Sequence, residues 1–132
     1  MRYNLPMLTD TPGLQDYFER VHAVTQYIRE HTDEPLNREV LAAVAGFSVP
    51  HFHRIFTACL GENMASYVRR MRMERAGRKL RMGAVDITEV ALAAGYGTHA
   101  AFSKAFKQQF GLSPSEFRQL DCPAASQILR KG

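Results

Sequence analysis

Two short segments carry side chains whose types and spacing suit hydrogen bonding to the edges of DNA bases. They run over about residues 48–60 and 98–110, and each sets polar and basic side chains opposite a stripe of phenylalanines. Arginine can donate two hydrogen bonds to guanine, whereas lysine, histidine and serine can bond to base edges or phosphates. We therefore predict a DNA-binding surface made by these outward side chains: Pro50, His51, His53, Arg54, Thr57, His99, Ala100, Ser103, Lys104 and Lys107.

The two segments belong to two copies of one sequence repeat. Gly46 and Gly95 are 49 positions apart, whereas Phe56 and Phe106, further along, are 50 apart. The second copy has therefore gained one residue just after its glycine. A repeat of this kind indicates two copies of one small structural unit.

Each copy has the pattern of a helix-turn-helix. Gly46 stands where a short helix that starts near Asn37 must end, because glycine accepts a left-handed backbone without penalty. Ala42 is small where two helices cross closely, and Ser48 can cap the helix that follows. In this motif the N-terminal part of the second helix faces the base edges in the major groove.

Apolar periodicity predicts an all-α fold of about seven helices, with no strand. We expect a loose arm over residues 1–13, a first subdomain over 14–62, a linker helix over 63–82, a second subdomain over 83–120 and an irregular tail over 121–132. The predicted core includes Val21, Val24, Ile28, Phe52, Phe56, Tyr67, Met71, Leu80, Phe102 and Phe106.

The linker helix has a length that suits DNA. With roughly 20 residues at about 1.5 Å each, it spans roughly 30 Å. Major-groove segments on one side of B-DNA repeat about every 34 Å. We therefore expect a monomer to read two adjacent groove segments. Because the two reading helices differ, the preferred site should be asymmetric.

Several helix starts carry capping residues. Asn37 and Asn63 can cap single helices, and the segments Asp86–Glu89 and Ser113–Glu116 have the pattern of capping boxes. Capped starts, including the one at Ser113, could hold phosphates through their backbone N–H groups.

The charge distribution agrees with an anionic partner. The chain has 132 residues, a net charge of +4 and seven basic residues between Arg69 and Arg81, where Glu74 is the one acid. This run has three possible roles: phosphate contacts, a solvated helix face, or, for Arg72 above all, pairing with acids inside the fold.

Other functional classes find little support in the sequence. There is no apolar run long enough to span a membrane, no signal-peptide pattern, and no catalytic or phosphate-loop motif. His51 and His53 diverge by about 200° on a helix, so they cannot easily share a metal ion. We expect neither enzyme activity nor a cofactor, and the two cysteines fit a reducing cytoplasm.

The residues closely resemble the signature of the AraC/XylS family of bacterial transcription regulators. The resemblance covers about residues 15–120, and it is most specific over Asp86–Arg118. It implies a seven-helix DNA-binding domain that recruits or positions RNA polymerase at promoters. We expect the chain to be an activator in the bacterial cytoplasm, associated with the nucleoid. The positions it implies for base reading are Pro50, His53, Arg54, His99, Ala100, Ser103 and Lys104.

The chain also departs from the family's pattern. Pro50 replaces a residue that is often long and polar, so reading by the first copy should rest mainly on His53 and Arg54. The chain has no room for an effector or dimerisation domain, so it is either a short stand-alone regulator or a fragment, with no small-molecule ligand expected. The alternative function is a helical protein–protein adaptor that has lost DNA binding; Arg54, Lys104 and Lys107 argue against it.

Overall fold

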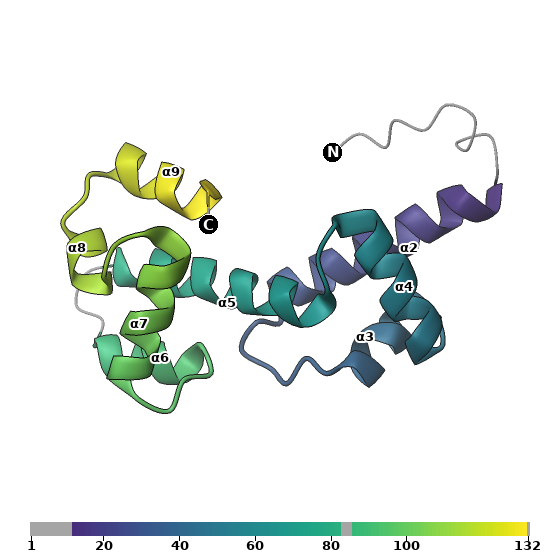
Figure 1. Ribbon diagram of the computed structural model, residues 1–132, viewed down its shortest axis with the longest axis horizontal. Coiled ribbons are helices and arrows are strands. Elements are labelled where there is room, and N and C mark those ends of the chain that lie inside the picture. Colours follow the sequence, from purple (N-terminus) through teal and green to yellow (C-terminus); the bar gives the residue numbers. More distant parts are fainter. Residues whose placement is uncertain (1–11, 83–85, 132) are drawn as a thin grey trace. The chain divides into compact units, whose positions relative to one another are not determined.

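The computed structural model describes residues 12–82 and 86–131, and these residues form eight helices and no strand (Figure 1). The all-α prediction is confirmed. The predicted N-terminal arm lies outside the described residues, apart from the first residues of the helix that follows it. The helices are α2 (Pro12–Glu30), α3 (Arg38–Ala45), α4 (Val49–Leu60), α5 (Met64–Leu80), α6 (Ile87–Ala93), α7 (His99–Phe110), α8 (Pro114–Arg118) and α9 (Cys122–Lys131).

The chain divides into two compact units inside α5, between Val68 and Arg69. In unit 1, the part up to Val68, α2, α3 and α4 pack against one another. The predicted core residues of α2, Val21, Val24 and Ile28, are buried in this core. The most deeply buried side chains of unit 1 are Val21, Val24, Ile28, Leu41, Phe52 and Phe56.

Unit 2, which begins at Arg69, has its own hydrophobic core. Here α7 packs against α6, α8 and α9. Rings dominate this core: Phe106 lies 4.6 Å from Phe110 and 5.4 Å from Phe117 between ring centroids. The remaining buried members are Met73, Ala76, Leu80, Val90, Ala91, Ala94, Phe102 and Ala125.

The predicted linker helix is therefore shared between the two cores. The ring of Tyr67 packs on Phe56 at 5.7 Å in unit 1, whereas Met73, Ala76 and Leu80 belong to the core of unit 2. Asn63 caps the helix as predicted, because its side chain accepts from the backbone N–H of Ser66 at 2.8 Å.

The prediction of an irregular C-terminal tail is wrong, because residues 122–131 form α9. Asp121 caps this helix by accepting from the backbone N–H of Ala124 at 2.9 Å. Ala125 is buried and Leu129 packs against the core of unit 2, where it approaches Gly77 of α5. A Cβ on Gly77 would lie 2.5 Å from Leu129, so the glycine makes room for α9.

Candidate nucleic-acid interface

The turn between α3 and α4 is formed by Gly46 and Phe47 together with the last turn of α3. Gly46 has φ +76°, in the left-handed region where a side chain would be strained. The backbone N–H of Phe47 donates to the carbonyl of Ala42 at 3.0 Å, and that of Gly46 donates to Ala43 at 3.1 Å. These two bonds make a Schellman motif, which ends α3 and turns the chain into α4.

The second copy repeats this turn. Gly95 has φ +95°, and the backbone N–H of Tyr96 donates to the carbonyl of Ala91 at 3.0 Å. Thr98 then caps α7 by accepting from the N–H of Ala101 at 3.0 Å. The extra residue of the second copy lies in this connection, since α7 starts four positions after its glycine and α4 starts three after Gly46.

Three of the predicted residues of α4 are exposed: Pro50, His53 and Arg54. They lie in its N-terminal half, opposite the buried rings of Phe52 and Phe56. Ser48 occupies the N-cap position, but its side chain makes no capping hydrogen bond. The arrangement presents a guanidinium and an imidazole together on the outer face of this helix.

The other two predicted residues of α4 point elsewhere. The half-buried ring of His51 lies 4.9 Å from the ring of Phe47 and 5.6 Å from that of Tyr17. The hydroxyl oxygen of Thr57 is buried and has no hydrogen-bond partner among the described residues. Direct contact with DNA is therefore not favoured by the geometry of either side chain. His51 instead packs the start of α4 against α2.

The predicted residues of α7 lie on its outer face. His99, Ala100, Lys104 and Lys107 are exposed, and Ser103 is half-buried. The opposite face is buried through Phe102, Phe106 and Phe110. Tyr96 packs on Phe102 at 5.8 Å between ring centroids, so it serves the core, as does Phe47 in unit 1.

At the helix start at Ser113, the backbone N–H groups of Ser113 and Glu116 already have acceptors, so they are not free to bind a phosphate. The Glu116 carboxylate accepts from the backbone N–H of Ser113 at 2.8 Å, and the Ser113 hydroxyl accepts from the N–H of Glu116 at 3.1 Å. The pKa of Glu116 is lowered, first by that backbone N–H, then by the Ser113 side chain and by the charge of Lys107. Because an anion already occupies this start, we do not retain it as a phosphate site.

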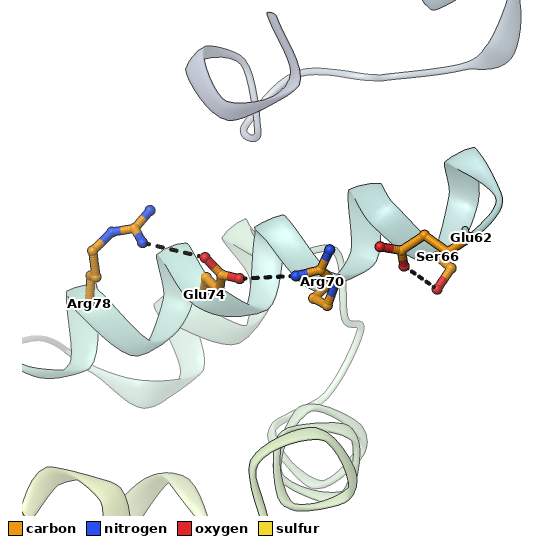
Figure 2. A network of polar contacts seen from close by, with 5 residues as sticks. All are labelled: Glu62, Ser66, Arg70, Glu74 and Arg78. Carbon is orange, nitrogen blue, oxygen red and sulfur yellow. Dashed lines mark hydrogen bonds and ion pairs between the residues drawn. The ribbon is translucent and has the colours of Figure 1, made fainter. Parts of the chain in front are cut away.

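Much of the basic run in α5 is engaged within the protein. Figure 2 shows Glu74 between Arg70, at 3.5 Å, and Arg78, at 4.0 Å, with Glu62 and Ser66 paired near the start of α5. Arg72 and Arg75 also have partners. The run is therefore largely structural over its described contacts, and it contributes less free positive charge than its composition indicates.

Arg81 ends this run by holding the C-terminal end of α8. Its guanidinium donates to the carbonyls of Phe117 at 3.3 Å and Arg118 at 3.1 Å. It also lies 5.9 Å from the centre of the Phe117 ring. These contacts stabilise unit 2 and leave this arginine engaged.

Arg20 of α2 braces the turn before α4, and the sequence did not single it out. Its Nη1 donates to the carbonyls of Ala45 at 3.3 Å and Gly46 at 3.2 Å, and its Nε pairs with Asp16 at 2.8 Å. The guanidinium also lies 5.1 Å from the centre of the Phe47 ring. The signal that could have found it is the four-residue spacing from Asp16 on one face of α2.

A groove of about 550 Å³ opens beside the exposed residues of α4. It brings together the start of α3, the first half of α4 and the start of α5. The residues that line it are Arg38, Val49, Pro50, Phe52, His53, Arg54 and Met64. The three predicted base-reading residues of α4, Pro50, His53 and Arg54, thus share one concave surface with a second arginine.

Neither a metal site nor a membrane span is found in the described part of the chain. It contains no group of three or more His, Cys, Asp or Glu side chains that could hold a metal ion. No helix within residues 12–82 or 86–131 is both long and apolar enough to cross a membrane.

Known proteins are similar to this chain in sequence. The family described as "Helix-turn-helix domain" matches residues 41–120. Regulatory protein SoxS of Salmonella typhimurium is 31% identical over 98 residues, which is 74% of this chain and 92% of SoxS.

Solved structures are similar to this chain over about three quarters or more of its length. The C-terminal domain of AraT, a response regulator from Geobacillus stearothermophilus, is 32% identical with a TM-score of 0.66, covering 76% of this chain and 84% of that one. The DNA-binding domain of the global transcriptional factor AdpA, solved in complex with a target DNA, is 27% identical with a TM-score of 0.66. That likeness covers 86% of this chain and 98% of the AdpA chain.

Proposed function

The chain belongs to the AraC/XylS family of helix-turn-helix transcription regulators, and we propose that it binds specific double-stranded DNA sequences through α4 and α7. The observation that carries this proposal is the duplication itself. Each unit presents an exposed, polar and basic helix face directly after a Schellman turn. Nothing in the comparisons favours the adaptor alternative.

We propose that corresponding residues on the two reading helices make the same kinds of contact with DNA. Arg54 and Lys104 occupy corresponding positions, and both are exposed, so both can reach guanine or phosphate. His53 and Ser103 also correspond, and each can donate or accept at a base edge. Further contacts are proposed for Pro50, His99, Ala100 and Lys107.

The finer regulatory role also rests on the family. Because one chain carries two helix-turn-helix units, we propose that it works as a monomer on DNA. Because family members act at promoters, we also propose that it recruits or positions RNA polymerase as an activator. It would then act on the bacterial nucleoid. The family is one of transcription regulators, and we propose no catalytic activity and no cofactor.

Selection of bound sequences from a random duplex library tests the central proposal, followed by affinity measurements against salt concentration. A DNA-binding regulator should enrich one sequence, and its affinity should fall steeply with salt because phosphate contacts release counterions. An adaptor would show almost no duplex binding even at low salt, and that result would reject the proposed function.

A further inference from the structure

We infer that the groove beside α4 holds a segment of the DNA backbone, with Arg38 as its phosphate-contacting residue; this inference rests on the proposed function. Arg38 is the first residue of α3, outside the reading helix. Its side chain is 69% exposed, and its Nε lies 4.0 Å from a carboxylate oxygen of the neighbouring Glu39, which is itself exposed. A pair of this kind leaves the guanidinium available to an anion.

The lining of the groove matches the chemistry of a sugar–phosphate chain. Arg38 and Arg54 supply two permanent positive charges to this lining, and Val49, Pro50 and Met64 supply apolar surface. A deoxyribose presents apolar carbon atoms and its phosphates carry the negative charge, so a backbone segment satisfies both kinds of lining. An apolar protein helix in the same place would bury two guanidiniums without partners.

The groove is also placed where a helix-turn-helix meets the backbone. In this motif the second helix enters the major groove and the first helix crosses the phosphates. Arg38 lies at the start of the first helix, and His53 and Arg54 lie on the second, yet all three line one groove. A strand that passes Arg38 would therefore hold the adjacent bases close to Arg54.

Unit 2 lacks this device at the corresponding positions. With the 49-residue offset, Arg38 corresponds to Ile87, which packs against the core of unit 2. The neutral cap Asn37 corresponds to the anionic cap Asp86. The start of the first helix therefore suits a phosphate in unit 1 and not in unit 2. We infer that Arg38 adds a backbone contact to the half of the site read by α4.

The test compares the full chain with Arg38→Gln, which removes the charge but keeps most of the stem, and with Arg38→Lys, which keeps the charge. Binding to the selected duplex and to a random duplex is followed by fluorescence anisotropy over a series of KCl concentrations. Arg38→Gln should weaken both complexes several-fold and reduce the slope of log affinity against log salt by about one. Arg38→Lys should keep a slope close to that of the wild type.

Arg29→Gln provides a matched control, because Arg29 is also exposed but lines a different groove with His22, Thr25 and Tyr67. It should change neither affinity nor slope. If the wild type binds DNA with a steep salt dependence and Arg38→Gln leaves that slope unchanged, the inference is wrong, and the groove is left to a small organic anion or an acidic peptide. A loss confined to one base position would also overturn it. Failure of the wild type to bind any duplex would instead reject the proposed function.

Discussion

The arginines of this chain divide according to what their guanidinium groups contact. Arg20 and Arg81 donate to backbone carbonyls, and Arg70 pairs with a carboxylate, so these side chains hold the fold. Arg54 is exposed on the reading helix. At the scale of single residues, location therefore decides between a structural role and a recognition role, and composition alone cannot.

Arg54→Ala should separate base reading from backbone attraction. If Arg54 makes a paired contact to guanine, its loss should cost about 1–3 kcal/mol of binding free energy at the selected site and relax the preference at one base pair. Competition binding against single-base variants of the selected site measures this. An equal loss on every sequence would show that Arg54 contacts phosphate, as we propose for Arg38.

Glu116 should make the stability of unit 2 depend on pH. Its pKa is lowered in the folded state, so the stability it contributes is present above the unfolded pKa of about 4.3 and is lost as pH falls through the lower folded value. Glu116→Gln removes this titration while keeping an acceptor for the Ser113 N–H. Urea unfolding should show a stability difference between wild type and variant at pH 6 that shrinks at pH 3. The same difference at both pH values would contradict the assignment.

At the scale of helices, the duplication extends further back than the turn motif. Positions in α2 and α5 correspond at an offset of 52, because the buried residues Val21 and Ile28 match Met73 and Leu80. Arg20 then matches Arg72, whose Nη1 would lie 3.9 Å from a Cβ on Gly95. Each unit thus sets an arginine of its preceding helix near the glycine of its turn.

Arg20→Ala should loosen the turn that orients α4. Removing hydrogen bonds from a partly exposed guanidinium to two carbonyls should lower stability by about 1 kcal/mol, after allowance for solvent screening. Because α4 starts just after this turn, affinity for the selected duplex should also fall. The preference for particular bases should weaken more in the half-site that α4 contacts than in the half-site that α7 contacts. Thermal unfolding and binding to half-site variants measure the two effects.

Asp16→Asn is the matched variant for Arg20, since it removes the ion pair and leaves both carbonyl bonds possible. Its effect on affinity should be much smaller. Equal losses at both half-sites in Arg20→Ala would mean that the brace stabilises the fold without orienting α4.

A structural feature could be predicted from the sequence where it depends on residues that are close together in the chain. The turn at Gly46, the cap at Asn37 and the capping box at Ser113 were predictable, because each depends on a few neighbouring residues. α9 was missed because its apolar pattern is short and because it packs, through Leu129, against Gly77, which is distant in the sequence. The orientations of His51 and Thr57 depend likewise on packing that helical periodicity alone does not specify.

At the scale of the whole molecule, two units with separate cores carry unlike reading faces. Arg54 and His53 of α4 correspond to Lys104 and Ser103 of α7, and Arg38 has no basic counterpart. A single chain therefore contains two different reading helices, whereas a symmetric dimer would present two identical ones. Recognition by one chain should produce a site without two-fold symmetry.

The stoichiometry of the complex tests this directly. We expect one chain of 14.9 kDa on each selected duplex, and a selected sequence that is not palindromic. Analytical ultracentrifugation of the complex measures the mass, and alignment of the selected sequences shows the symmetry. Two chains on a palindromic site would contradict this expectation, because a dimer of two chains with two-fold symmetry imposes that symmetry on its site.

A second measurement uses a duplex in which one half of the asymmetric site is reversed. If one monomer binds the site, this reversal should abolish specific binding, since α4 and α7 cannot exchange the half-sites that they contact.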